Sequence, residues 1–277
     1  MLVIAVGCAA PTPTAAPIVV PTEAPPALTE APTATVCVPQ ILDVSAAASL
    51  TEAFTEMGTT FQATDACVKP VFNFAGSQKL SQQIQEGAPV DVFASASKKN
   101  MEEVITAGLV ADSVSQVFAQ NGLAVVVCPT TSFKIESIKD LAQPGLKLVV
   151  AAKEVPVGDY TNQFLEKAAA DPDLGQSYVD AVKANEVSFE ADVKTVLTKV
   201  NLCEADAGIV YQSDGFSNPT PGIKMIVVPD TLNITAKYPI AVINSSDTPD
   251  LAQKFINFVL SPEGQAILVK YGLKAVK

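Results

Sequence analysis

The stretch DVSAAASLTEAF, residues 43–54, changes its hydrophobic period in the middle. Before it, Ile41–Val44 is typical of a short buried strand. Between strand and helix lie Ala46–Ser49, four of the smallest residues, with a hydroxyl last. The apolar residues that follow recur at helical spacing: Leu50, Phe54, Met57 and Phe61. The stretch therefore predicts a strand that enters a helix through a junction where a ligand can approach the backbone.

Strands and helices alternate from residue 38 onward, which predicts an α/β fold with mostly parallel sheets flanked by helices. Their number fits two α/β units better than one large sheet. The predicted strands are 41–45, 69–74, 90–94, 123–128, 146–151, 207–211, 224–228 and 238–243. The predicted helices are 49–63, 77–86, 98–107, 159–170, 174–183, 190–201, 248–260 and 262–271.

Composition excludes several classes of site. The net charge of −11 disfavours a nucleic-acid or anionic-membrane partner. The chain has no His, so Ser-His-Asp and Cys-His catalysis and His-bearing metal sites are impossible. It also has no Arg, and the bidentate clamp on carboxylates and phosphates is missing. Any bound anion must be held by Lys, hydroxyls or backbone N–H groups.

The first residues, MLVIAVGC, resemble the lipobox of a bacterial lipoprotein, with a signal over 1–8 and acylation at Cys8. The apolar run is too short to span a bilayer. Residues 9–37 are rich in Pro, Thr and Ala and predict a disordered tether. We therefore expect an exported lipoprotein in the periplasm or on the outer face of the cell membrane, attached through its lipid alone. The alternative is a merely apolar N-terminus.

Four further cysteines allow three disulfide pairings. Cys37 and Cys67 each precede a predicted strand by a few residues, which places them at one sheet edge if those strands are parallel neighbours. Cys128 ends one predicted strand and Cys203 precedes another. We favour Cys37–Cys67 and Cys128–Cys203, and four buried free thiols are the alternative.

The opening junction has two counterparts. VFNFAGSQKLSQQI (71–84) is a strand, a small-residue turn and an amphipathic helix, and LVVAAKEVPVGDY (148–160) repeats the pattern. Such junctions lie beyond the carboxyl ends of strands, where helix N-termini present unpaired N–H donors to anions. Ser49 has a second interpretation, because Ser49-Leu50-Thr51-Glu52 matches a capping box.

Four segments in order resemble the molybdate-binding proteins that serve ABC importers. They are AAASLTEAF (46–54), FAGSQKLSQQIQEGAPVDVFASASKKNM (74–101), VPVGDY (155–160) and AGIVYQSDG (207–215). The likeness extends to SPEGQAILVKYGL (261–273). It implies a two-lobed periplasmic-binding-protein fold of type II that holds a tetrahedral oxyanion between its lobes. The implied lobes are 38–122 plus 236–277, and 123–235.

The resemblance also implies the ligand-binding residues. Two hydroxyls of the first lobe, from Ser49 and Ser77, match the family's ligand donors. The remaining matches are the backbone N–H groups of Val157 and Val193, the Tyr211 hydroxyl and, as a further backbone donor, Ala48. The sequence departs from the family at Val157, where Ala is frequent, and at Gly76, where Ser is frequent. Alternatively, Val157 and Val193 are ordinary apolar residues and the Tyr211 hydroxyl faces water.

These features predict a binding protein rather than an enzyme. It would carry molybdate or tungstate to an ABC permease as a monomer, without a cofactor and without direct metal ligands. Binding of sulfate or thiosulfate is the alternative within the same class. The enzyme alternative is a secreted Ser-Lys hydrolase, because Ser95–Lys98 reads S-x-x-K, but the K-T-G partner motif is absent.

Overall fold

The computed structural model describes residues 2–4, 7, 10, 38–111, 114–218 and 220–276. The chain divides into two units, Met1–Cys37 and Val38–Lys277. The predicted acylation at Cys8 and the Cys37–Cys67 pair involve residues outside the described ones, and only residue 10 of the predicted tether 9–37 is described. No helix within the described ranges is long and apolar enough to cross a membrane.

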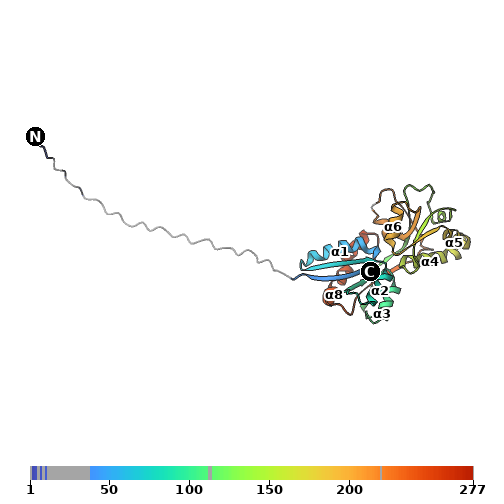
Figure 1. The fold of residues 1–277 in the computed structure, drawn as a ribbon, viewed down its shortest axis with the longest axis horizontal. Helices are drawn as coiled ribbons and strands as arrows, with labels where there is room; N and C mark the ends of the chain where they lie inside the picture. Colours follow the sequence, from blue (N-terminus) through green and yellow to red (C-terminus); the bar gives the residue numbers. More distant parts are fainter. Residues whose placement is uncertain are drawn as a thin grey trace. The chain divides into compact units, whose positions relative to one another are not determined.

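The first sheet of the larger unit has the strand order β11-β4-β10-β3-β1-β2 (Figure 1). Its strands are β1 (Gln40–Ala47), β2 (Val68–Ala75), β3 (Val92–Ala94), β4 (Gln116–Asn121), β10 (Ala236–Val242) and β11 (Lys274–Ala275). β1 pairs in parallel with β2 and β3. β10 runs antiparallel to β3 and β4, and β11 runs antiparallel to β4.

The second sheet has the strand order β7-β6-β8-β5-β9. Its strands are β5 (Leu123–Val127), β6 (Leu148–Ala151), β7 (Glu186–Glu190), β8 (Ala207–Tyr211) and β9 (Lys224–Val227). β6 is parallel to β7 and β8, whereas β5 is antiparallel to β8 and β9. Both sheets are thus mixed rather than mostly parallel, because the strand by which the chain enters each sheet at a crossing, β10 in the first and β5 in the second, runs antiparallel to its neighbours.

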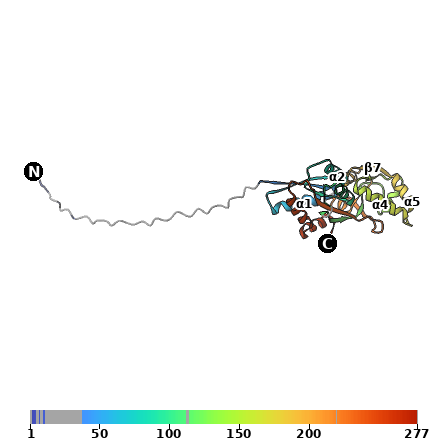
Figure 2. The same ribbon diagram turned by 90° about the horizontal axis from the view of Figure 1, so that it is seen from below.

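Helices flank both sheets, as the alternating pattern predicts. Against the first sheet pack α1 (Thr51–Thr64), α2 (Ser77–Gln85), α3 (Lys98–Thr106) and α8 (Pro249–Leu260), with α9 (Pro262–Lys270) packed on α1 and α8. Against the second pack α4 (Pro156–Ala170), α6 (Val193–Asn201) and α7 (Gln212–Phe216), with α5 (Gly175–Ala184) packed on α4. Figures 1 and 2 show these two groups of helices at opposite ends of the unit.

The chain crosses between the sheets twice, from β4 to β5 and from β9 to β10. A two-lobed fold results, because each sheet collects its own helices. The first sheet buries an aromatic cluster in which Phe54 of α1 packs against Phe118 of β4 and Phe255 of α8. This cluster ties together segments from both ends of the larger unit, and it lies behind the β1–α1 junction that opened the sequence analysis.

The predicted Cys128–Cys203 disulfide is confirmed. The two Cα atoms lie 5.3 Å apart, and the bond joins the end of β5 to the turn before β8. It therefore fastens two neighbouring strands of the second sheet.

Candidate functional site

One narrow pocket brings all six predicted ligand residues together between the two sheets. Its lining residues come from six strand–helix junctions: Ala47, Ala48, Ser49, Gly76, Ser77, Ala96, Val155, Pro156, Val157, Val193 and Tyr211. The cavity that these residues enclose has a volume of about 10 Å³, about the room that one water molecule needs. None of its lining residues is charged.

The Ser49 side chain lines the pocket and does not cap the helix that follows it. Residues Ala48–Leu50 form a 3-10 turn, and α1 begins only at Thr51, with no side-chain cap on Leu50. The predicted capping box is therefore not formed. Instead the Ser49 Oγ lies 3.0 Å from the Tyr238 hydroxyl, and Ser49 is 5 % exposed.

Ser77 opens α2 on the same wall of the pocket. It is the first residue of the helix, so its N–H has no intrahelical acceptor. Its Oγ accepts a hydrogen bond of 2.9 Å from the Ala96 N–H, and its own proton is left over. Ala48, which opens the 3-10 turn beside it, also presents an N–H from a first turn.

The opposite wall consists of two helix N-termini of the second lobe. Val157 is the second residue of α4, whose first position is Pro156, a residue favoured there by its fixed φ. A Cβ on Gly158 would lie 2.0 Å from the Ala152 carbonyl oxygen, so glycine allows α4 to begin this close to the end of β6. Val193 opens α6, where the Asp192 side chain accepts from the Thr195 N–H at 2.9 Å.

Tyr211 closes this second wall at the end of β8. It is 1 % exposed, and its hydroxyl makes no hydrogen bond of ordinary geometry with a described residue, although the Tyr238 hydroxyl lies near it. Burial raises the pKa of this phenol well above its ordinary value, so it stays neutral and keeps its proton. A buried hydroxyl without a partner costs about 1–3 kcal/mol unless something binds to it.

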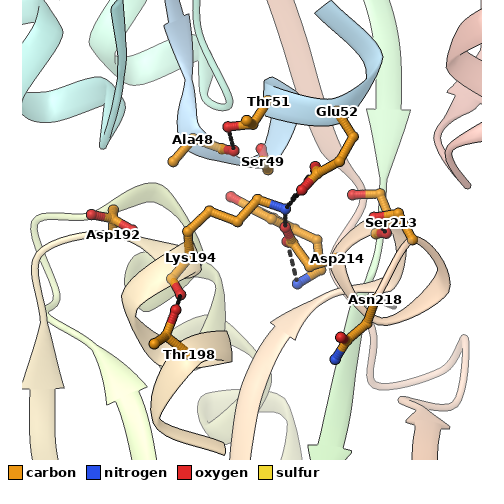
Figure 3. A network of polar contacts seen from close by, with 12 residues as sticks. Ala48, Ser49, Thr51, Glu52, Asp192, Lys194, Thr198, Ser213, Asp214 and Asn218 are labelled. Carbon is orange, nitrogen blue, oxygen red and sulfur yellow. Dashed lines mark hydrogen bonds and ion pairs between the residues drawn. The ribbon is translucent and has the colours of Figure 1, made fainter. Parts of the chain in front are cut away.

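An ion-pair network joins the two lobes (Figure 3), and it includes Lys194, the residue that follows the pocket residue Val193. Lys194 of α6 places its Nζ 2.8 Å from Glu52 Oε2 of α1 and 2.9 Å from Asp214 Oδ1 of α7. Asp214 is fully buried and also accepts from the Tyr211 N–H at 3.3 Å. Burial works against the Lys194 charge, but the two carboxylates outweigh it and raise the pKa of this ammonium. Burial likewise raises the pKa of Asp214, and Lys194 opposes this shift.

A second contact between the lobes depends on Gly76. The Gln78 Nε2 of α2 donates to the Ala191 carbonyl oxygen at 3.0 Å. A Cβ at position 76 would lie 2.5 Å from the Gln78 Oε1 and 2.7 Å from the Ala191 oxygen. Glycine at this departure from the family pattern therefore leaves room for the Gln78 bridge.

The residues of the hydrolase alternative do not form a catalytic pair. Ser95 is fully buried, and its hydroxyl donates to the Ser97 carbonyl oxygen at 2.8 Å. Lys98 begins α3 with its side chain exposed. Neither residue lines the pocket. Within the described ranges, no group of three or more acidic or cysteine side chains lies close enough to hold a metal ion.

Sequence reasoning missed the residues that support the pocket from behind. Tyr238 of β10 and Asn121 of β4 carried no local signal. Lys194 and Asp214 stand next to or near predicted ligand residues, but Glu52 was assigned only to a capping box. The signal that could have found the network is the single Lys that directly follows Val193 at a helix N-terminus.

A two-lobed α/β fold with a small pocket of uncharged residues between its lobes is typical of a solute-binding protein. The chain belongs to the bacterial extracellular solute-binding protein family, whose sequence model matches residues 42–274.

Relatives in this family confirm the resemblance noted in the sequence. The molybdate-binding protein ModA of Mycobacterium tuberculosis H37Rv is 38 % identical over 229 residues, 83 % of this chain and 82 % of that protein. A solved structure, the substrate-binding domain of a putative molybdenum ABC transporter from Clostridium difficile, is 33 % identical, with a TM-score of 0.64 over 86 % of this chain and 99 % of that one. The periplasmic molybdate-binding protein of Azotobacter vinelandii has a TM-score of 0.74 over 85 % and 100 %; at 19 % identity it shows the fold alone.

Proposed function

We propose that this protein binds a tetrahedral oxyanion, molybdate or tungstate, between its two lobes and delivers it to an ABC-type membrane permease. The observation that carries the proposal is a pocket of uncharged donors that includes the partnerless Tyr211 hydroxyl. The relatives at 38 % and 33 % identity that carry molybdate or molybdenum in their names support the choice of ion.

In this proposal each wall supplies its own kind of donor. Ser49 and Ser77 donate their hydroxyl protons from the first lobe. The second lobe contributes the backbone N–H groups of Val157 and Val193 and the Tyr211 hydroxyl. The Ala48 N–H is a further donor from the first lobe. Molybdenum or tungsten stays inside its oxyanion, so no side chain ligates the metal directly.

Neutral donors suffice for a dianion because hydrogen bonds to a charged partner contribute about 1.5–3 kcal/mol each. Six of them, offset by dehydration and lost freedom, leave micromolar or tighter binding. The net charge of −11 repels a dianion at long range, but salt screens that repulsion beyond about 8–10 Å. Affinity in this protein is therefore local to the pocket.

The two lobes would close on the ligand as two bodies. We assign 38–122 plus 236–277 to the first lobe and 123–235 to the second, with the hinge at the two chain crossings. Closure is favoured when an anion joins the two walls, because each wall alone supplies only part of the donor set. The closed form would then dock on the permease.

The remaining parts of the proposal concern the whole protein. Cys8 would carry a lipid, and residues 9–37 would act as the tether that keeps the lobes near the membrane. The protein would act as a monomer without a cofactor and without catalytic turnover. The extracellular family supports export of the chain.

The test is a titration of the purified protein with molybdate, tungstate, sulfate, thiosulfate and phosphate by isothermal calorimetry, backed by melting curves. Molybdate and tungstate should bind with micromolar or tighter affinity and raise the melting temperature, since both bind the native state. Sulfate should bind more weakly. If none of the tetrahedral dianions binds, the proposal fails; if sulfate or thiosulfate binds tightest, the alternative within the class replaces it.

A further inference from the structure

We propose that Tyr238 and Asn121 fix the proton of the Ser49 hydroxyl so that it points into the pocket, and that this relay makes the site discriminate against anions that carry a proton. The inference rests on the proposed function, because it concerns the same pocket. It adds two positioning residues that lie behind the lining and do not touch the ligand.

The relay begins at Asn121, whose amide orientation is set by two backbone donors. The Asn121 Oδ1 accepts from the Gly122 N–H at 3.0 Å and from the Ser213 N–H at 3.4 Å. The Nδ2 group must therefore point the other way, where it donates to the Ser213 Oγ at 2.7 Å and to the Tyr238 hydroxyl at 3.3 Å. Asn121 is 1 % exposed, so water does not compete for these bonds.

The Tyr238 hydroxyl connects Asn121 to Ser49. An amide NH₂ can only donate, so the Tyr238 oxygen accepts from Asn121 and has one proton left to give. The Ser49 Oγ lies 3.0 Å from that hydroxyl, at a distance where either oxygen could donate, and we assign the remaining Tyr238 proton to Ser49 because the Tyr238 oxygen already accepts from Asn121. Tyr238 is fully buried, and its ring packs against Phe118 and Tyr211 at 6.3 and 5.8 Å between centroids. The phenol is therefore held in place by packing as well as by its bonds.

Ser49 is left with a single proton, and the pocket is the direction open to it. The Ser77 hydroxyl is also left with one proton to donate, because its Oγ accepts directly from the Ala96 N–H. In this arrangement each of the two hydroxyl oxygens on the first wall accepts a hydrogen bond from the protein and has its own proton free to donate to the ligand. A hydrogen phosphate or hydrogen arsenate must itself donate a proton, and it meets donors on this wall. Sulfate and molybdate carry no such proton and are not penalised.

The test is Tyr238→Phe, which removes the hydroxyl and keeps the ring. Sulfate and hydrogen phosphate are similar in size and geometry and differ in the proton, so their affinity ratio reports the relay. Both are measured by displacement of molybdate in calorimetry. We expect molybdate to bind about fivefold more weakly and the sulfate-to-phosphate ratio to fall at least about threefold, since one oriented hydrogen bond is lost.

Tyr178→Phe is the matched control. Tyr178 is a buried tyrosine of α5 whose hydroxyl donates to the Ile138 carbonyl oxygen at 2.8 Å, away from the pocket. This variant loses a buried hydroxyl of the same kind, so both the molybdate affinity and the ratio should stay as in the wild type. A fall of the ratio in both variants would mean a general loosening of the fold and would overturn the relay.

Asn121→Asp provides a second, independent variant. A carboxylate at this position accepts from Tyr238, so the Tyr238 proton turns away from Ser49 and the relay reverses. At a pH well above the second pKa of phosphate, where phosphate is a dianion like sulfate, the added charge repels both alike, so the ratio between them still reports the proton, and it should fall further than in Tyr238→Phe. An unchanged ratio in both variants overturns the inference. If the wild type itself fails to bind molybdate, the proposed function fails instead, and the two failures are distinguishable.

Discussion

The two walls of the pocket satisfy their polar groups in different ways. On the first wall, the Ser49 hydroxyl is bonded to Tyr238 and the Ser77 Oγ to the Ala96 N–H, so both are positioned by their own lobe. On the second wall, the Tyr211 hydroxyl makes no hydrogen bond of ordinary geometry with the residues that the structure describes. The first wall is thus preorganised, whereas the second wall is completed only by a ligand. This difference explains how one anion can favour closure of the two lobes.

Removal of the preorganised wall should have the greatest consequence. In Ser49→Ala/Ser77→Ala, two hydrogen bonds to a charged ligand are lost, and molybdate should bind about 100-fold more weakly or worse. Calorimetry measures this loss, and circular dichroism should show a folded protein with its usual melting transition. Wild-type affinity in the double variant would mean that the ion does not bind at this wall.

The second wall should respond differently to Tyr211→Phe. The variant loses one donor to the ligand, so molybdate should bind about tenfold more weakly. The ligand-free protein, in contrast, should melt at the same temperature or higher, because the buried hydroxyl that lacks a partner is gone. The measurement is a pair of melting curves beside the titration. A clear drop in the melting temperature of the ligand-free variant would show that Tyr211 already has a partner.

The contact between the walls can be tested at two glutamates one turn apart on α1. Glu52 pairs with Lys194 of the second lobe, whereas Glu56 pairs with Lys270 of its own lobe at 2.6 Å. Glu52→Gln should weaken molybdate binding about threefold, a small effect because the pair is partly exposed. Glu56→Gln is the matched control and should leave the affinity unchanged. Equal molybdate affinities in the two variants would mean that the Glu52–Lys194 ion pair does not contribute to closure of the lobes.

The Glu56–Lys270 pair lies within the first lobe, so we expect it to affect the pH dependence of stability and not the affinity for molybdate. Hydrogen bonds from Lys270 and Tyr271 lower the pKa of Glu56 below its ordinary value of 4.5. Its contribution is therefore present above pH 4.5 and is lost as the pH falls through the lowered pKa. The free energy of unfolding of wild type and Glu56→Gln should converge in that acidic range, as measured by urea titration. A difference that persists below this range would contradict the assignment.

Local sequence pattern predicted most of the fold but not its polar or very short elements. β7 was missed because only two apolar residues, Val187 and Phe189, alternate over its 5 residues, which is too short a pattern to stand out between two helices. α7 was missed because it has only 5 residues. The register of β10 against β3 and β4 depends on pairing between distant segments, which local periodicity does not contain.

The candidate site likewise has a part that the local sequence predicted and a part that it did not. The six predicted ligand residues line one pocket because each stands at a strand–helix junction that the sequence marks with small residues or a helix start. Their supporting partners were not predictable in this way, since Tyr238 lies 189 residues from Ser49 and Lys194 lies 142 residues from Glu52. Only the fold brings those pairs together.

The central claim is that uncharged dipoles hold the anion between the lobes. A crystal structure with bound molybdate, located by anomalous scattering at the molybdenum edge, tests it directly. We predict one ion in the pocket, with its oxygens within hydrogen-bond distance of the Ser49, Ser77 and Tyr211 hydroxyls and no lysine ammonium in contact. An empty pocket with the ion seated on lysine side chains elsewhere would contradict the account.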